Sequence, residues 1–421
     1  MNPRAAAHRI LAAVRDGTFS DPAAERILPR VEPADRGLAL ELANGCLRLR
    51  ARMDTWIEAF TDRPLARIDD DVLDWLRLGV YQLKELRVPD HAAVFETVRA
   101  ARATMDAGRA GFVNGVLRAV ASDPDRDPFP SRDEDPLAYL STWGSHPEWL
   151  LRRWLDRWGV AAVMRLVRHA NAPPPVVVRS FEDGDPAPDG QVELRRLSAW
   201  NGSFELVRGT PARALERVKG VIQDPAASAV VDYVGRDIAD PVLDVCAAPG
   251  TKAAALAAST GRPVFAFDIS PRRLRRTLRG AERAGRSIAV AAADARRPPV
   301  ARAGTVLADV PCTGTGVLRR RADARWRLEE GRIADLVELQ AEIMDACAGI
   351  VEEGGWLVYA TCSLEPEENE DQVEAFLATH PDFGRDPLPE LPVPESCITD
   401  DGDLFVRPWL TGTDGSYAAR L

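Results

Sequence analysis

Two cysteines lie directly after hydrophobic, strand-like runs, and their thiols are the side chains of this sequence best suited to covalent chemistry. Cys312 follows the run 305–311, and Cys362 follows the run 355–361. A buried parallel strand brings its C-terminal end to a ligand crevice. A thiolate placed there can attack a substrate carbon. A free cysteine is often just a small buried hydrophobe, but two at neighbouring strand ends predict a catalytic pair.

A third strand-like run, residues 241–246, leads into a tight turn that favours a nucleotide-type cofactor. The turn lacks the GxGxxG pattern of dinucleotide sites, and it is not a phosphate-binding P-loop, because Ala253 replaces the Ser or Thr that follows the P-loop lysine. A nucleoside cofactor without a diphosphate fits better, and S-adenosylmethionine is the candidate. The residues expected to hold it are Cys246, Ala247, Ala248, Pro249, Gly250, Thr251 and Lys252.

Four carboxylates also stand at successive predicted strand ends: Asp244, Asp268, Asp294 and Asp309. One such Asp is ordinary, because Asp often caps the following helix; four in succession favour ligand binding. Asp268, one strand after the turn, is placed to accept from a ribose diol. Asp294 is expected to reach the adenine amino group, and Asp244 is expected to hold the methionine part together with the turn backbone.

Length and composition restrict the class of protein. The chain has 421 residues, of which 46% are hydrophobic, enough for two or three domains. We expect no membrane span, since every apolar run is shorter than the roughly 18–20 residues required. Six cysteines without a CxxC pair argue against a disulfide scaffold and a zinc site. The sequence therefore predicts a reduced, cytoplasmic, metal-free protein, and we expect a monomer.

Charge is distributed unevenly along the chain. The formal net charge is −10, yet residues 271–327 contain 15 Arg and four acidic residues, a local excess of +11. Such a patch predicts contact with phosphates, with a solvated helix face as the alternative. Lysine occurs at positions 84, 219 and 252 alone. A compact ammonium at Lys252 in an arginine-rich chain favours a specific point-charge role.

Periodicity divides the chain into four parts. Residues 1–125 carry apolar residues at three- and four-residue spacing and predict an all-helical domain. Residues 126–136 are acidic and proline-rich and predict a linker. Residues 137–220 predict a small α+β domain, with two helices before three strands.

Residues 221–421 predict the catalytic domain, in which strands alternate with helices. The strands are expected at 241–246, 263–268, 287–293, 305–310 and 355–361, and a closing hairpin at 403–407 and 416–421. This alternation predicts a Rossmann-like α/β fold with a mostly parallel, doubly wound sheet and a C-terminal antiparallel hairpin.

Several segments resemble those of RNA 5-methylcytosine methyltransferases, namely residues 244–252, 309–316, 320–326 and 359–370. The N-terminal part resembles the NusB-like domain of the RsmB (Sun/Fmu) branch, through Asp35-Arg36, Asn44-Gly45 and residues 112–118. Gln223-Asp224 and the ending 414–421 extend the resemblance over nearly the whole chain. The Pro-Cys and Thr-Cys pair is its most specific part.

The resemblance implies S-adenosylmethionine-dependent methylation of carbon 5 of cytosine in RNA, with small-subunit ribosomal RNA as the expected substrate. Cys362 would add to carbon 6 of the base, and Cys312 would assist product release. Asp309 would bind the cytosine edge, and Lys252 would orient Asp309 or the nucleophile. Further implied cofactor contacts are Arg273, Asp309 and Pro311, and the implied RNA contacts are Arg319, Arg320, Arg321, Arg325 and Trp326.

The chain departs from the family pattern at three positions, none of which removes a group with direct chemistry. Thr251 stands where glycine is usual, so the turn must keep an ordinary backbone conformation or carry strain. Thr313 replaces Ser and keeps the hydroxyl, while Ser416 replaces an aromatic residue.

Other functions remain open at this point. One is a tRNA cytosine-5 methyltransferase. Another is a non-catalytic NusB-like RNA-binding or antitermination factor, which the intact site residues Cys312, Cys362, Asp309 and Lys252 argue against. A methyltransferase for proteins or small molecules would not require two thiols. The N-terminal domain is either an RNA-binding surface or purely architectural.

Overall fold

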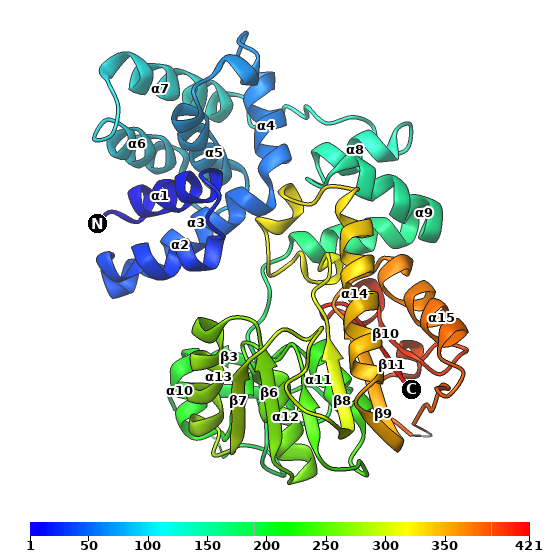
Figure 1. The fold of residues 1–421 in the computed structure, drawn as a ribbon. Coiled ribbons are helices and arrows are strands. Elements are labelled where there is room, and N and C mark those ends of the chain that lie inside the picture. Colours follow the sequence, from blue (N-terminus) through cyan, green and yellow to red (C-terminus); the bar gives the residue numbers. More distant parts are fainter. Residues whose placement is uncertain (188–189, 389) are drawn as a thin grey trace. The chain divides into compact units, whose positions relative to one another are not determined.

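The computed structural model describes residues 1–187, 190–388 and 390–421. Two compact units can be distinguished by their internal contacts (Figure 1). The helical unit contains Met1–Pro173 and Leu318–Leu328, and the sheet unit contains Pro174–Val317 and Glu329–Leu421. Residues Leu318–Leu328, called the inserted segment below, therefore belong to the helical unit although the sheet unit flanks them in sequence.

The helical unit is built from amphipathic helices around one apolar core. The helices are α1 (Pro3–Arg15), α2 (Ser20–Ile27), α3 (Arg36–Arg48), α4 (Arg50–Ala59), α5 (Asp70–Lys84), α6 (Asp90–Ala101), α7 (Ala107–Ser122), α8 (Pro136–Thr142) and α9 (Glu148–Asn171). Gly159 has non-helical backbone angles inside α9, which explains why the sequence predicts two helices there. The predicted helical character of the N-terminal region is confirmed, although α2 and α8 were not predicted.

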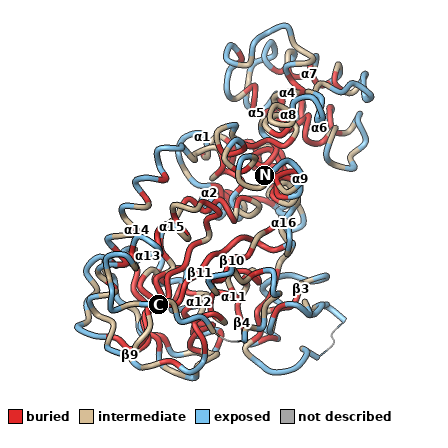
Figure 2. Tube along the Cα trace, turned by 90° about the vertical axis from the view of Figure 1, so that its right-hand side faces the viewer, coloured by how far each residue is buried: buried red, intermediate tan, exposed pale blue. Residues whose placement is uncertain are grey.

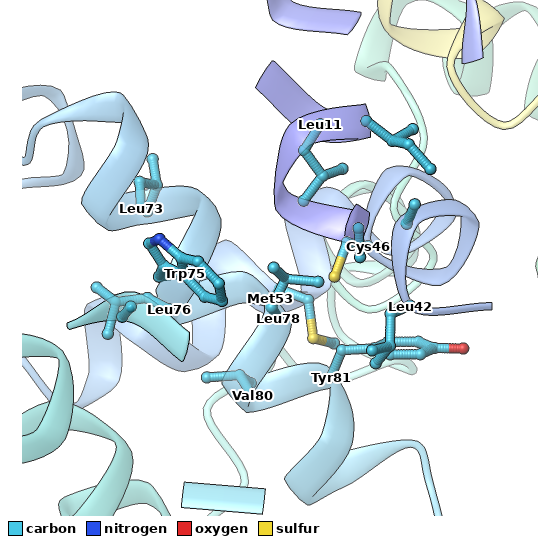
Figure 3. Packing of buried hydrophobic residues seen from close by; sticks show 14 of the residues in the cluster. Leu11, Leu42, Cys46, Met53, Leu73, Trp75, Leu76, Leu78, Val80 and Tyr81 are labelled. Carbon is cyan, nitrogen blue, oxygen red and sulfur yellow. The ribbon is translucent and has the colours of Figure 1, made fainter. Parts of the chain in front are cut away.

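Helix α5 lies at the centre of this core. Its Trp75, Leu76 and Leu78 side chains are fully buried, and Leu11 and Met53 are in the same cluster (Figure 3). Burial of such side chains contributes roughly 1.5–3 kcal/mol each. Apolar residues at helical spacing therefore account for this part of the fold.

Gly45 of α3 shows why one position in this core must lack a side chain. A Cβ at Gly45 would lie 2.0 Å from Cζ of Tyr81, so glycine lets the ring pack directly on the α3 backbone. The Tyr81 hydroxyl donates to Oε1 of Glu41 at 2.6 Å, which satisfies its polar end.

A small antiparallel sheet begins the sheet unit. Among the described residues its order is β2-β3-β1-β4, with β1 (Val177–Ser180), β2 (Glu193–Arg196), β3 (Ser203–Arg208) and β4 (Gly220–Ile222). The predicted domain of residues 137–220 is divided in the structure: α8 and α9 belong to the helical unit, where α8 packs on α4, and the strands belong to the sheet unit.

The larger sheet confirms the predicted Rossmann-like fold. Over the described ranges its order is β10-β11-β9-β8-β5-β6-β7. Its strands are β5 (Val242–Asp244), β6 (Val264–Asp268), β7 (Ile288–Ala292), β8 (Ala303–Asp309), β9 (Val351–Thr361), β10 (Leu404–Val406) and β11 (Ser416–Arg420). Neighbours from β9 to β7 pair in parallel, whereas β11 pairs antiparallel with β9 and β10. The predicted closing hairpin is thus confirmed.

The strand order reverses between β5 and β8, and open α/β sheets bind ligands at such a switch point, beyond the carboxyl ends of the strands. Strands β10 and β11 are buried throughout (Figure 2). The helices of this unit are α10 (Pro211–Arg217), α11 (Pro225–Val234), α12 (Thr251–Thr260), α13 (Pro271–Arg283), α14 (Arg332–Ala348), α15 (Glu370–Thr379) and α16 (Pro408–Thr411).

Within the described parts of the chain, no helix combines the length and the apolar character that a membrane crossing needs.

Candidate active site

The structure brings the two predicted thiols together. Cys312 follows β8 and Cys362 follows β9, and these strands are parallel neighbours whose ends are in register, with Asp309 opposite Ala360. The two Sγ atoms lie 3.3 Å apart, and the backbone N–H of Cys362 donates to Sγ of Cys312, also at 3.3 Å. A direct contact between the sulfur atoms makes this pair one chemical unit.

Close backbone approach holds the two cysteine loops in this arrangement. The N–H of Gly316 donates to the carbonyl of Cys362 at 3.0 Å, and the N–H of Gly415 donates to the carbonyl of Gly316 at 2.8 Å. A Cβ at Gly316 would lie 2.7 Å from the Cys362 carbonyl oxygen. A side chain at Gly316 would therefore separate the loops.

Lys252 and Asp309 form an ion pair beside the thiols. Nζ of Lys252 donates to Oδ2 of Asp309 at 2.8 Å. Burial acts to lower the pKa of Lys252, but the charge and hydrogen bond of Asp309, with further contributions from Cys362 and Asp244, raise it overall. The ammonium is therefore retained at neutral pH, within electrostatic reach of Cys362.

Gly250 permits the turn that places Lys252. Its φ is +96°, a conformation that L-residues rarely adopt, and a Cβ there would lie 2.3 Å from Cγ2 of Thr277 on α13. Thr251 follows as the first residue of α12. Among the described residues Ser145 is the non-glycine residue with a positive φ, so Thr251 keeps an ordinary conformation in place of the family's glycine.

Asp244, at the end of β5, is a buried carboxyl group whose hydrogen-bonding capacity is unsatisfied. Its side chain is 1% exposed, and neither carboxylate oxygen has a hydrogen-bond partner of normal geometry among the described residues. Burial and the nearby charge of Asp309 raise its pKa to about 8, opposed by Lys252 and by the backbone N–H of Cys246. Buried polar groups are normally paired, so Asp244 fits a cationic ligand group such as the ammonium of a methionine moiety.

Asp268 and Arg273 lie at the adjacent strand end. The Asp268 carboxylate accepts from the N–H groups of Ala248 (3.2 Å) and Ser270 (2.9 Å). Arg273 pairs with Asp268 at 3.5 Å and donates to the Ala248 carbonyl. The predicted cofactor turn is thus tied directly to the predicted ribose-binding acid.

Two other predicted cofactor residues, Asp294 and Pro311, have polar contacts within the protein. Asp294 pairs with Arg296 at 2.8 Å, and hydrogen bonds from Arg296 lower the pKa of this carboxylate. Pro311 is exposed, and its carbonyl accepts from Nε2 of Gln340 at 2.9 Å. A contact of Asp294 with adenine stays a prediction.

The structure places Arg325 inside the helical unit rather than on a surface open to RNA. The side chain is 0% exposed. Its guanidinium donates to the carbonyls of Arg48 (2.9 Å), Ser145 (3.0 Å) and Ala170 (3.1 Å), and to Oδ1 of Asn171 (2.8 Å). The predicted RNA contact by Arg325 is therefore corrected: these carbonyls take the donors that a phosphate would need.

Trp326 and Arg319 also bind the inserted segment to the rest of the helical unit. Nε1 of Trp326 donates to the carbonyl of Leu47 at 2.7 Å. Arg319 donates to the carbonyls of Ala172 (3.0 Å) and Pro173 (2.7 Å). Arg320 is half-buried and Arg321 is exposed, so Arg321 is the residue of the predicted RNA group that is most accessible.

Sequence reasoning assigned no role to Glu368, whose buried carboxylate contacts the residue after Cys312. Nε2 of Gln340 on α14 donates to the same carboxylate. The available signal was the acidic run 365–370 directly after the Thr-Cys-Ser segment. The run is polar and would normally be read as exposed.

Comparisons with known proteins agree with this geometry. Residues 236–421 match the family described as 16S rRNA methyltransferase RsmB/F, and residues 1–122 match the NusB family. A Bacillus subtilis (strain 168) protein named probable ribosomal RNA small subunit methyltransferase B is 32% identical over 408 residues, covering 92% of this chain and 90% of the relative. This chain belongs to the RsmB/F family of 16S rRNA methyltransferases. The resemblance stated from the motifs is thereby confirmed.

A second relative supports the same assignment, and one solved structure shares the fold. The ribosomal RNA small subunit methyltransferase B of Pseudomonas syringae pv. tomato is 34% identical over 405 residues, covering 90% of this chain and 87% of the relative. The crystal structure of PH0851 matches 100% of this chain and 98% of its own with a TM-score of 0.78 at 21% identity, which shows the fold. The RsmB/F family uses S-adenosylmethionine, and this confirms the predicted cofactor.

Proposed function

We propose that this RsmB/F-family methyltransferase methylates carbon 5 of cytosine in small-subunit ribosomal RNA through a covalent adduct with Cys362. The observation that carries the proposal is the pair of thiols 3.3 Å apart at the carboxyl ends of β8 and β9, with the Lys252–Asp309 ion pair beside them. Methyltransferases that act on an already nucleophilic atom need no such pair. A ring carbon does need covalent activation.

The first step uses the Cys362 thiolate. Its sulfur adds to carbon 6 of the cytosine ring, and the electrons of the carbon 5–carbon 6 double bond move toward N3. Carbon 5 becomes the nucleophilic end of an enamine. Lys252 supports this step because its positive charge favours the ionised form of a neighbouring thiol.

Asp309 is proposed to hold the N3 and amino edge of the cytosine. As the addition moves electrons to N3, N3 takes up a proton from solvent, and the N3–H and the amino group then donate to the Asp309 carboxylate. Because Lys252 donates to Oδ2 of Asp309, the lysine also fixes the carboxylate in one orientation.

The cofactor crevice is proposed to lie along Asp244, the turn 246–250 and Asp268. S-adenosylmethionine, when bound, supplies an electrophilic methyl group on a sulfonium sulfur. Asp244 would pair with the ammonium of the methionine part, which satisfies its two orphaned oxygens. Asp268 would contact the ribose, and the backbone of the turn would exclude water.

Cys312 is proposed to act at product release. Transfer of the carbon 5 proton to solvent restores the ring double bond and breaks the bond between carbon 6 and Sγ of Cys362, which leaves as a thiolate. The thiol of Cys312, in contact with that sulfur, can donate a hydrogen bond to the departing thiolate. Without it, the methylated base would remain attached to the protein.

The RNA contacts proposed for this chain are Arg320 and Arg321, together with the arginines of α13, where one acidic residue, Glu282, stands among six arginines. The target base must leave any stack to reach a thiol in a crevice. Small-subunit ribosomal RNA is proposed as the substrate because three relatives, matched over 84–97% of this chain, are named ribosomal RNA small subunit methyltransferase B or probable members of that group.

A methyl-transfer assay tests the proposal. Radiolabelled S-adenosylmethionine is incubated with unmodified 16S RNA and with bulk tRNA, using wild type and Cys362→Ala. We expect label in 16S RNA as 5-methylcytosine and none with the variant. Label in tRNA alone would contradict the substrate, and label at another base position would contradict the chemistry.

A further inference from the structure

Glu368 is a buried carboxylate attached to the cysteine loops. It ends the short helix η6 (Pro366–Glu368) and is 0% exposed. Oε1 accepts from the backbone N–H of Thr313 at 2.8 Å and from Nε2 of Gln340 at 3.0 Å. Oε2 accepts from the Thr313 hydroxyl at 2.5 Å. Two of these three donors come from the residue directly after Cys312.

The same network reaches the residue directly after Cys362. The hydroxyl oxygens of Ser363 and Thr313 are 3.1 Å apart. Because the Thr313 hydroxyl donates to Glu368, Ser363 is the donor in this bond. Nδ2 of Asn369, the next residue after Glu368, donates to the Ser363 carbonyl at 3.0 Å. Glu368 and Asn369 thus hold the two cysteine loops from one side.

The charge of Glu368 faces neutral donors. Among the described residues, the donors to its carboxylate are the Thr313 N–H, the Thr313 hydroxyl and Nε2 of Gln340, and no lysine or arginine forms an ion pair with it. The hydrogen bond with Cys362, burial, and the charges of Cys362 and Glu368 raise the pKa of Cys312. On the other side of the pair, the Lys252 ammonium is within electrostatic reach of Cys362.

We propose that Glu368 is the positioning residue that holds the Cys312 loop against Cys362 and makes the two thiols unlike, so that Cys362 is the nucleophile and Cys312 the proton donor. The assignment of roles rests on the proposed function. The physical claim, a negative charge behind Cys312 and a positive charge near Cys362, stands on the contacts and can be tested without RNA.

Glu368→Gln separates charge from geometry. The glutamine oxygen can accept from the Thr313 N–H and from Gln340, and its amide can donate to the Thr313 hydroxyl oxygen. The Thr313 hydroxyl can then donate to Ser363, so the same groups stay in contact while the charge is lost. Glu368→Asp keeps the charge on a shorter stem. Glu338→Gln is the matched control, because it makes the same charge change at an exposed position of α14.

The experiment measures alkylation of each thiol by iodoacetamide against pH, in the full-length protein, at less than one label per chain, with peptide mass spectrometry. Thiolate is the reactive form. In wild type and in Glu338→Gln we expect Cys362 to react at lower pH than Cys312. In Glu368→Gln we expect the Cys312 profile to move down by about one pH unit, which is about tenfold faster reaction below its midpoint, while the Cys362 profile moves less.

Glu368→Asp should leave the Cys312 profile close to that of wild type. An unchanged Cys312 profile in Glu368→Gln would overturn the proposal, and so would equal shifts of both thiols, which a general loss of packing would cause. A thermal melting curve of each variant checks the fold. The alkylation experiment contains no RNA, so a negative result there does not affect the methyl-transfer assay. A negative methyl-transfer assay likewise does not affect the alkylation result.

Discussion

The Cys312 and Cys362 loops look alike in sequence but differ in their surroundings. Each follows a buried parallel strand, and each cysteine precedes a residue with a hydroxyl group. Cys362 lies within electrostatic reach of the Lys252 ammonium, whereas the residue after Cys312 is bound by the Glu368 carboxylate. Helix α12 and the segment after β9 therefore bring opposite charges to two thiols in direct contact. Elements distant in sequence therefore determine the electrostatic surroundings of each cysteine.

The largest expected effect is that of Cys362→Ala. Removing the nucleophile should lower turnover by at least about 10³-fold, because nothing else activates carbon 5. Radiolabel incorporation into 16S RNA measures this. Turnover that survives in Cys362→Ala but is lost without any adduct in Cys312→Ala would reverse the two roles.

Lys252→Met removes the positive charge near Cys362. We expect turnover to fall by about 10²-fold, since the variant loses the ion pair with Asp309 and the charge that favours the Cys362 thiolate. The alkylation profile of Cys362 should move to higher pH, with a smaller change for Cys312. Lys219→Met, at an exposed lysine, is the control and should match wild type.

Asp244→Asn should change the cofactor crevice. Loss of a charge-assisted contact should weaken binding of S-adenosylhomocysteine by about 10- to 100-fold, measured by calorimetry. Unchanged affinity would remove Asp244 from the crevice.

The pH dependence of stability gives a second readout for Asp244. Its folded-state pKa of about 8 exceeds the ordinary value of 3.8, so the cofactor-free folded state holds an extra proton between these values. Stability from this group is therefore full at low pH and is lost as pH rises through about 8. Melting temperatures between about pH 5 and about pH 9 should fall less in Asp244→Asn than in wild type.

The smallest expected effect on chemistry, with a measurable effect on stability, is that of Arg325→Lys. An ammonium cannot reach the carbonyls and amide oxygen that the guanidinium binds, so unfolding of the helical unit should become easier by about 3 kcal/mol. Chemical denaturation measures this. Arg321→Lys, at an exposed arginine of the same segment, should leave stability unchanged; equal losses in both variants would contradict the buried role.

Sequence patterns were sufficient to predict the fold and the polar and thiol side chains at the strand ends. Strands predicted at 263–268 and 287–293 correspond to Val264–Asp268 and Ile288–Ala292, because apolar runs with turn residues at their ends leave few alternatives. The contact of Cys312 with Cys362 followed from their equivalent positions on neighbouring strands.

The sequence could not distinguish buried charged residues from exposed ones. Arg325 and Arg321 occur in the same arginine-rich run, yet Arg325 is fully buried and Arg321 is exposed. The carbonyls that bind Arg325 come from residues more than 100 positions away in the sequence. Glu368 was missed for the same reason. Its donors, Thr313 and Gln340, are brought to it by tertiary structure alone.

The covalent adduct of Cys312→Ala with RNA tests the central claim most directly. The variant is incubated with 16S RNA and S-adenosylmethionine, and denaturing electrophoresis followed by peptide mass spectrometry locates the attachment. We predict a stable adduct at Cys362 carrying a methylated cytosine, absent from the Cys312→Ala, Cys362→Ala double variant. Methylated RNA released at the wild-type rate with no adduct, or attachment at another residue, would contradict the account.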